Sequence, residues 1–402
     1  MQPQARIFEL YLDRADNLHM FQRGQVMKIA IFSDTHLGYA RFEKDSLDQA
    51  ERVVESANKT ADLIIHAGDV FDIKNPKLET IDRAIHIFKK ADKKIITIHG
   101  NHERRAKDMV NPAQILHSAS VLHYIHNSCE IIELNGEKLQ LFGLGNVPDE
   151  YADLALRKAL ENFIPMPDAF KILIIHQSIK ELLVNSEHEL SLDYLESLPF
   201  DLIVNGHIHQ KIIKLNGRFI IPGSTVITQL KKEETAPRGY ILYDTKTKTH
   251  DFVEVECRKF VMEELVFDQA SAIDILNAVE KRISEIRSTD ENCIIRFKVQ
   301  GTTKETNQSV SLNEISNEST YIDNELNSSG LAEKMKQIRQ IKDDKLSVRE
   351  LAVSQIEEKT KDKVSLFNSR DIFDKLLCEQ EDVLTYLKEM RDKSEAIPKS
   401  AN

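Results

Sequence analysis

The chain has 402 residues, of which 41% are apolar and 30% charged, and its formal net charge is −11. This length exceeds one ordinary domain and predicts two or three. The acidic balance excludes a protein that coats nucleic acid through bulk positive charge, so any phosphate-binding surface must be a local basic patch.

Residues 1–26 precede the first strand-like segment and contain no unbroken apolar run, so we expect a flexible N-terminal extension. Met27 lies directly before that segment, which leaves a later start of translation open. No stretch approaches the ~18 consecutive apolar residues that a membrane span needs. The four cysteines lie far apart and form no C-x-x-C pair, which favours reduced thiols. These features predict a cytoplasmic protein without a membrane anchor.

Between residues 27 and 249, short apolar runs recur: "KIAIFSD", "DLIIHAGD", "KIITIHG", "KILIIHQ" and "DLIVNGH". In the first half they alternate with the helix patterns "SLDQAERVVESANK" and "ETIDRAIHIFKKA". This alternation predicts an α/β fold, a sandwich in which buried strands are layered with helices. Asn135-Gly136 and Asn216-Gly217 each lie between strand-like segments and predict two-residue hairpin turns, so we expect mixed sheets.

Residues 250–328 change to a strand–helix–strand pattern, which predicts a small α+β domain. A linker is expected over 329–344, a helical segment over 345–392 and a tail over 393–402. In the helical segment, apolar residues recur at helical spacing; those of interest are Ile372, Phe373, Leu376, Leu377, Leu384 and Leu387. These helices either fold back onto the body or dock onto a partner protein, and the sequence leaves both open.

Five of the apolar runs end in a polar cluster: "DTH", "GD", "GNH", "HQ" and "GHIH". In a layered α/β protein, strand ends that face one edge bring such residues into one crevice. The oxygen and imidazole ligands gathered in this way are Asp34, His36, Asp69, Asn101, His176, His207 and His209.

Seven such ligands favour two metal ions, because a single ion would leave some of them buried and unpaired. Asp69 follows a glycine in a sharp turn and is the natural bridge. One ion would then be bound by Asp34, His36 and His209 in addition to Asp69, and the other by Asn101, His176 and His207. Mixed oxygen and imidazole ligands suit Mn²⁺, Fe or Zn²⁺ better than Mg²⁺. Two ions ~3.5–4 Å apart can clamp an in-line displacement at phosphorus.

His102 follows Asn101 directly and cannot share its direction, so it is the candidate that protonates the leaving oxygen; the alternative is a hydrogen bond to a ligand only. His66 and His99 are expected to be core histidines with satisfied hydrogen bonds. Glycines 68, 100 and 206 each precede a ligand, where the absence of a Cβ permits a strained turn.

The ordered set "DTH", "GDVFD", "GNHE", "HQ" and "GHIH" resembles the calcineurin-like metallophosphoesterase superfamily over residues 27 to about 245. "FSDTHLG", "GNHERR" and "GHIHQK" are similar to its double-strand-break-repair nuclease, or SbcD-like, branch. In several superfamily members the fourth residue of the segment that starts at Asp69 is a histidine that helps to position the substrate. Here it is Asp72, as in the SbcD-like branch, and an ionised carboxylate cannot donate that hydrogen bond.

The resemblance implies a nuclease domain over 27–249, a capping domain over 250–328 and an ATPase-binding segment over 345–392. It assigns the metal-ligand role to the seven residues above and the catalytic role to His102. It further implies two Mn²⁺ per subunit, a homodimer, and exonuclease and endonuclease activity on double- and single-stranded DNA ends during double-strand break repair. The partner expected from it is an SMC-like ABC ATPase.

Basic residues near the cluster are the expected DNA contacts. They are Arg104, Arg105, Lys107, Lys231 and Lys232, for which a solvated charged loop is the alternative. Two other functions stay open at this point. One is a phosphatase or small-molecule phosphodiesterase of the same superfamily, and the other is a mainly structural scaffold of the ATPase complex.

Overall fold

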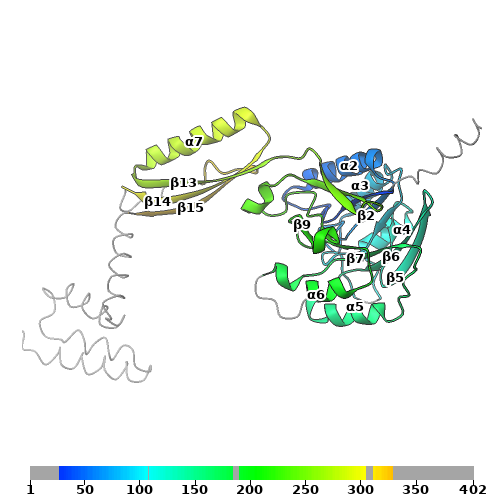
Figure 1. Cartoon of the computed structure of the whole chain (residues 1–402). Helices are drawn as coiled ribbons and strands as arrows, with labels where there is room; N and C mark the ends of the chain where they lie inside the picture. Colours follow the sequence, from blue (N-terminus) through cyan, green and yellow to red (C-terminus); the bar gives the residue numbers. More distant parts are fainter. Residues whose placement is uncertain (1–26, 107, 184–189, 305–310, 329–402) are drawn as a thin grey trace, which may run out of the picture. The chain divides into compact units, whose positions relative to one another are not determined.

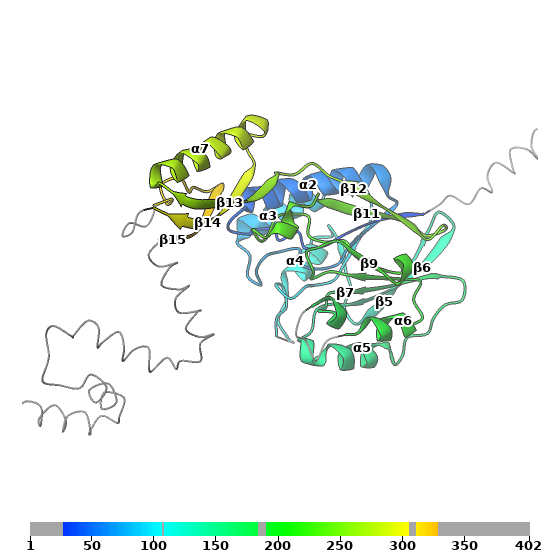
Figure 2. The same cartoon turned by 60° about the vertical axis from the view of Figure 1, so that its left-hand side comes forward.

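The computed structural model describes residues 27–106, 108–183, 190–304 and 311–328. Between Lys28 and Glu254 the chain forms two six-stranded sheets. Helices α2 and α3 lie on one side of this pair of sheets, and α5 and α6 lie on the other (Figures 1 and 2). The predicted α/β class with mixed, helix-flanked sheets is confirmed.

The first sheet has the strand order β12-β11-β1-β2-β3-β4. Strands β1 to β4 are parallel neighbours, whereas β11 is antiparallel to both β1 and β12. The strand bounds are β1 Lys28–Phe32, β2 Leu63–His66, β3 Ile95–Thr97, β4 His123–Tyr124, β11 Gly239–Asp244 and β12 Thr249–Glu254. Strand β12 crosses the predicted domain boundary at residue 250 and belongs to this sheet.

The second sheet has the order β5-β6-β7-β8-β10-β9. Strands β6, β7, β8 and β10 are parallel neighbours, and antiparallel edge strands flank them. The bounds are β5 Ser128–Leu134, β6 Glu137–Leu144, β7 Phe170–Ile175, β8 Leu202–Asn205, β9 Ile212–Lys214 and β10 Phe219–Ile221.

Helices cover the outer faces of both sheets. The α-helices are α2 Glu43–Thr60, α3 Leu78–Phe88, α4 Pro112–Ser118, α5 Ala152–Leu160 and α6 Leu192–Ser197. Short 3₁₀ turns are η1 Asp149–Tyr151, η2 Lys180–Leu182, η3 Leu215–Gly217 and η4 Lys232–Thr235. The helices predicted at 46–59 and 79–91 are found as α2 and α3, with ends that differ by one to three residues.

Successive side chains of a buried strand point to opposite faces of the sheet, so each strand contributes to two hydrophobic cores. Ile29 and Ile31 of β1 face inward and pack with Ile172 and Ile174 of β7 between the sheets. The alternate residues of β1 face the other way and join the core under α2 and α3. A third cluster fills the space between the second sheet and helices α5 and α6. Because both faces of these strands are buried, their sequences are almost continuously apolar.

One of the two predicted hairpin turns is confirmed, and the other is longer than predicted. Asn135 and Gly136, at φ 54° and 77°, join β5 to β6 as a two-residue loop. Asn216 and Gly217 lie between the antiparallel strands β9 and β10, but in a four-residue loop. Leu215 is also left-handed there, at φ 51°, so the turn starts one residue earlier than an Asn-Gly turn would.

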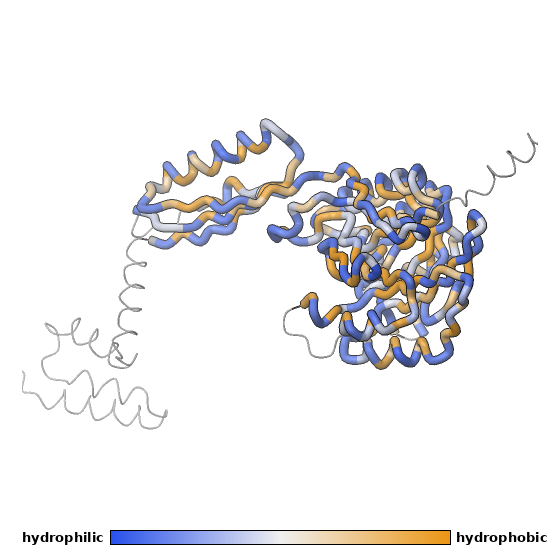
Figure 3. Tube along the Cα trace, viewed as in Figure 1, coloured by the Kyte–Doolittle hydropathy of each residue, from blue (hydrophilic) through white to orange (hydrophobic). Residues whose placement is uncertain are grey.

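A three-stranded sheet follows, in the order β13-β14-β15, with α7 between its first two strands in sequence. The bounds are β13 Phe260–Ala270, α7 Ala272–Thr289, β14 Ile294–Thr303 and β15 Thr320–Ser328. The chain has two compact units, and β13 passes from the first into the second after Glu264. Helix α7 alternates between hydrophobic and hydrophilic residues along its turns (Figure 3), as an amphipathic helix does. The domain bounds inferred from the sequence stay a prediction.

Several expectations fall outside the described residues: the extension 1–26, the linker 329–344, the helical segment 345–392 with its apolar residues, and the tail 393–402. Cys129, Cys257 and Cys293 are free thiols, whereas Cys378 also lies outside the described part. Within the ranges that the structure describes, no helix has both the length and the apolar character to cross a bilayer.

Candidate metal centre

The seven predicted ligands converge at one edge of the paired sheets. Asp34 and His36 follow β1, Asp69 follows β2 and Asn101 follows β3, three parallel neighbours of the first sheet. His176 follows β7, and His207 and His209 follow β8, which are parallel neighbours in the second sheet. Parallel strands end at the same edge, and the apolar layer between the sheets holds the two edges against each other.

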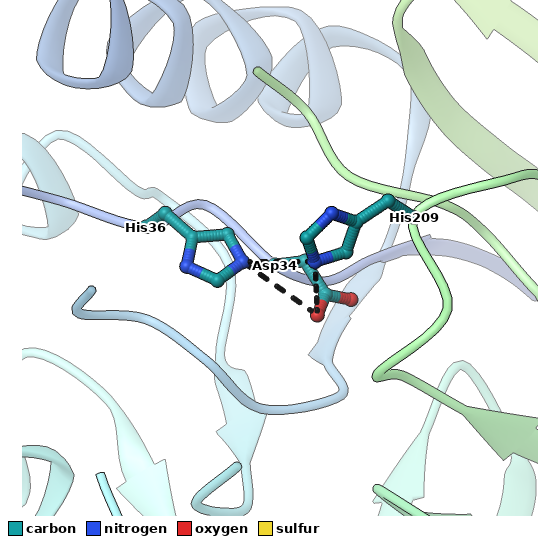
Figure 4. A group of neighbouring side chains, drawn as sticks. All are labelled: Asp34, His36 and His209. Carbon is teal, nitrogen blue, oxygen red and sulfur yellow. Dashed lines mark hydrogen bonds and ion pairs between the residues drawn. The ribbon is translucent and has the colours of Figure 1, made fainter. Parts of the chain in front are cut away.

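Asp34, His36 and His209 form a first group (Figure 4). The Asp34 Oδ1 lies 4.0 Å from the Nε2 of His36 and 3.8 Å from the Nε2 of His209. The two Nε2 atoms are 3.1 Å apart. The Nδ1–H of His36 donates to Asp72 at 3.1 Å and that of His209 to the hydroxyl of Thr228 at 2.5 Å. In the neutral rings both Nε2 lone pairs therefore face one another, an arrangement that calls for a cation or a proton between them.

Asn101, His176 and His207 form a second group. The Asn101 Oδ1 lies 3.1 Å from the His176 Nε2 and 2.8 Å from the His207 Nδ1. Asp69 lies between the two groups: its Oδ2 is 3.2 Å from the His176 Nε2, and its donor atoms also cluster with those of His36. This is the place that a bridging carboxylate would take.

Four of the seven residues have a left-handed backbone that side chains rarely adopt. The φ angles are 54° for Asp34, 45° for His36, 54° for Asp69 and 75° for His207. Such conformations cost roughly 1–3 kcal/mol each and persist where neighbouring contacts impose them. Here the N–H of Asp34 donates to Gly68 at 3.0 Å, and that of His207 donates to the Asp34 carboxylate at 3.2 Å. Strain stored at ligand positions is typical of functional sites.

Of the three glycines that precede ligands, only Gly68 has the strained backbone that was expected. Gly68 does adopt a left-handed turn, at φ 92°. Gly100 and Gly206 do not adopt a left-handed conformation. Neighbouring groups approach them so closely that a side chain at either position would clash. A Cβ on Gly100 would lie 2.0 Å from the Asp69 Oδ1, and one on Gly206 would lie 2.5 Å from the His176 Nδ1. At these positions the missing Cβ makes room for the ligand of another strand.

Burial controls the electrostatics of the cluster. Burial raises the pKa of Asp34. For Asp69, burial opposes ionisation, but the charge and hydrogen bond of His176, together with the charges of His36 and His102, outweigh it, and the pKa of Asp69 falls. The Asp69 carboxylate in turn overcomes the effect of burial on His176 and raises the pKa of that ring to about 9. Burial lowers the pKa of His207 to about 4 and of His209 to about 3, so both rings are uncharged at neutral pH, as metal ligation requires.

The donor set fits divalent metal ions. Asp34 and Asp69 are 0% and 1% exposed, and among the described residues their charged neighbours are histidines, with no lysine or arginine ion pair. Two buried carboxylates without a fixed cation are costly unless an ion compensates them. Oxygen and imidazole ligands without sulfur match a catalytic rather than a structural metal site.

His102 lies beside the cluster, and one of its ring nitrogens groups with donor atoms of His36 and Asp69. Its Nδ1–H donates to the backbone carbonyl of Asp72 at 2.5 Å, and its side chain is 37% exposed. A carbonyl can only accept, so the proton of the neutral ring is on Nδ1 and the lone pair is on Nε2. The ring packs edge-on against His36 with centroids 4.8 Å apart. This geometry is compatible with a proton donor to a leaving group.

The two histidines assigned to the core are confirmed there. The His66 Nε2 lies 3.1 Å from the Thr35 hydroxyl, and the His99 Nδ1 lies 2.7 Å from the Tyr124 hydroxyl. Burial lowers the pKa of both rings to about 3. Both rings are therefore neutral and hydrogen-bonded to their surroundings.

Three supporting residues received no role from the sequence. Glu103 is fully buried and accepts from the N–H of Phe71 and of Gly100, both at 3.0 Å. In the sequence, its position directly after Asn101 and His102 in "GNHE" could have indicated that Glu103 supports the site. Thr228 and Glu234 lie behind His209, in a loop whose sequence carries no sign of this contact.

The predicted DNA contacts divide between two places. Arg104 donates to the Asn146 Oδ1 at 2.7 Å, and with Arg105 and Lys74 it lines a surface cavity of ≈490 Å³. Lys231 and Lys232 are exposed in the loop that follows Leu230. Lys107 lies outside the described residues.

Comparison with known proteins gives a family and several relatives. Residues 27–211 match the family model for the calcineurin-like phosphoesterase. The chain is 27% identical over 301 residues to the double-strand break repair protein MRE11 of Encephalitozoon cuniculi, covering 64% of this chain and 52% of the relative. It is 26% identical over 278 residues to the DNA double-strand break repair protein Mre11 of Methanocaldococcus jannaschii, covering 63% and 74%.

A further archaeal relative, the DNA double-strand break repair protein Mre11 of Archaeoglobus fulgidus, is 25% identical over 300 residues, covering 65% of each chain. The matched region therefore spans about half of the first relative, 74% of the second and 65% of the third.

Proposed function

Because residues 27–211 match the calcineurin-like phosphoesterase model, we propose that the chain is a metal-dependent nuclease that hydrolyses phosphodiester bonds at DNA ends during double-strand break repair. The observation that carries the proposal is the convergence of seven oxygen and imidazole ligands, from five strand ends of two sheets, around two buried carboxylates.

In this proposal Asp34, His36 and His209 hold one ion and Asn101, His176 and His207 the other, with Asp69 shared. When bound, two divalent ions stabilise the charge that develops on a phosphodiester during in-line displacement. Mn²⁺ is the metal that we propose, because it accepts both carboxylate and imidazole ligands. The first group offers a carboxylate and two imidazoles, and the second offers a neutral amide in place of the carboxylate.

His102 is the proposed proton donor. Its Nδ1 is occupied by the Asp72 carbonyl, so a protonated ring presents its Nε2–H to the leaving oxygen. Its exposure gives substrate access, whereas His66 and His99 are buried. Such a donor typically contributes 10²–10⁴-fold to the rate.

The cavity lined by Lys74, Arg104 and Arg105 is the proposed contact for the DNA backbone. Arg104 and Arg105 follow His102 by two and three residues, so a phosphate bound there would lie on the chain segment that carries the proton donor. Lys107, Lys231 and Lys232 extend the proposal to neighbouring loops. Positive charge of this kind gives affinity that falls steeply with salt.

The assembly is proposed from family resemblance. We propose a homodimer that binds an SMC-like ABC ATPase through residues 345–392, acts on double- and single-stranded DNA ends and is located in the cytoplasm. Both exonuclease and endonuclease activity belong to the proposal.

The test is cleavage of an end-labelled linear duplex and of a single strand by the full chain in Mn²⁺, with EDTA as one control and His102→Ala as the other. We expect Mn²⁺-dependent degradation that falls 10²–10⁴-fold in the variant, while two ions still bind. Intact DNA beside rapid hydrolysis of p-nitrophenyl phosphate would replace the nuclease with a phosphatase. A metal-loaded protein without hydrolytic activity that binds the ATPase would favour the scaffold.

A further inference from the structure

Thr228 and Glu234 form a hydrogen-bonded chain behind His209. The Thr228 Oγ1 lies 2.5 Å from the His209 Nδ1 and donates its own proton to the Glu234 Oε1 at 3.3 Å. Since the hydroxyl proton points to the carboxylate, the hydroxyl oxygen must accept from His209. The proton of the neutral ring therefore stays on Nδ1, and the Nε2 lone pair points to Asp34 and His36 (Figure 4).

The chain is buried and held in place from several directions. Thr228, Glu234 and Arg238 are 8%, 6% and 5% exposed. The Glu234 Oε2 accepts from the Thr228 N–H at 3.0 Å and from Arg238 at 2.8 Å. The Tyr39 hydroxyl donates to the Thr228 carbonyl at 2.6 Å. A carboxylate so enclosed acts through a medium of low dielectric, where its hydrogen bonds are strong.

The two groups of ligands differ in what lies behind their imidazoles. His36 and His209 are backed by carboxylates, Asp72 directly and Glu234 through Thr228. By contrast, His176 donates from Nδ1 to the Ala67 carbonyl at 2.7 Å. His207 meets the Ser178 hydroxyl at 3.1 Å. A carboxylate behind an imidazole makes its other nitrogen a more basic ligand than a neutral acceptor does.

We propose that Thr228 and Glu234 are positioning residues that hold His209 for the metal and set the affinity of the Asp34–His36–His209 position. This position is thereby the tighter of the two. The inference rests on the proposed function only in requiring that metal ions bind at the cluster.

Mn²⁺ titration of the metal-free full chain without DNA, followed by calorimetry, tests this. Wild type should bind two ions in steps of different affinity. Thr228→Val removes the acceptor and should weaken the tighter step 10–100-fold. Thr228→Ser keeps the hydroxyl, so the Mn²⁺ affinity of the tighter step should equal that of wild type.

Thr225→Val is the matched control. Thr225 is fully buried three residues earlier, and among the described residues its hydroxyl has no hydrogen-bond partner. The same change there should leave both steps unaltered. Unfolding of each metal-free variant, followed by circular dichroism, separates a lost ligand orientation from a lost fold.

If Thr228→Val is unfolded, Glu234→Gln becomes the test and should weaken the same step, because it removes the charge behind the hydroxyl. A folded Thr228→Val that binds both ions as wild type does would overturn the proposal. An equal loss of Mn²⁺ affinity in Thr225→Val would also overturn the proposal, because the effect would then come from packing and not from the hydrogen bond to His209. Wild type that binds no Mn²⁺ would instead refute the metal centre and the proposed function with it.

Discussion

Replacing Glu103 with alanine should destabilise the first compact unit without touching a metal ligand directly. The carboxylate joins two loops, because it accepts from the N–H of Phe71 after β2 and of Gly100 after β3, both at 3.0 Å. Glu103→Ala leaves two buried N–H groups unpaired, and each costs about 1–3 kcal/mol. Burial raises the pKa of Glu103 to about 7, so removing the carboxyl also relieves a desolvation cost. The expected net loss is at the lower end, about 2–3 kcal/mol.

For a unit of this size a loss of 1 kcal/mol lowers Tm by roughly 2–4 °C, so the variant should melt about 4–12 °C below wild type. The assay is urea and thermal unfolding in EDTA, followed by far-ultraviolet circular dichroism because the chain has no tryptophan. Glu133→Ala is the control, since that side chain is 73% exposed, and it should stay within about 0.5 kcal/mol. Glu103→Ala that unfolds with the same free energy as this control would refute the reasoning.

Three further outcomes are expected. Gly100→Ala should lose Mn²⁺ binding and stability together, because the new Cβ would lie 2.0 Å from the Asp69 Oδ1; a variant that still binds two ions by calorimetry contradicts this. Arg105→Ala should weaken DNA binding and lower the slope of log affinity against log salt by about 0.9 for each lost phosphate contact, with hydrolysis of p-nitrophenyl phosphate unchanged. Free Mn²⁺ at 100 times its Kd should stabilise the protein by about 2.7 kcal/mol over EDTA, and an unchanged Tm in calorimetry would argue against binding to the folded state.

The sequence allowed the fold class and the converging residues to be predicted, because both depend on local patterns. Short apolar runs marked the buried strands, and polar residues just after them marked the shared edge. Each cluster alone is a weak signal. Their common position at strand ends brought Asp34, His176 and His207 together although more than 170 residues separate the first from the last.

What the sequence did not predict depends on contacts between distant loops. Nothing in the letters around Thr228 indicates that its hydroxyl meets His209, and only the packing of the two loops decides it. The loop at Asn216 is longer than the Asn-Gly pair predicts, because Leu215 joins the left-handed turn. Gly100 was expected to permit a strained turn before Asn101, but the absence of its Cβ makes room for Asp69 of another strand.

The division of the ligands between two sheets has a consequence for synthesis of the chain. Asp34 through Asn101 follow strands of the first sheet, whereas His176, His207 and His209 follow strands of the second. His36 and His209 are separated by 173 positions. A growing chain therefore carries no complete ion site until residue 207 has left the ribosome, and the site that contains His209 is completed two residues later. Mn²⁺ taken up earlier would meet an incomplete set of donors at either position, so loading follows the closing of the two sheets.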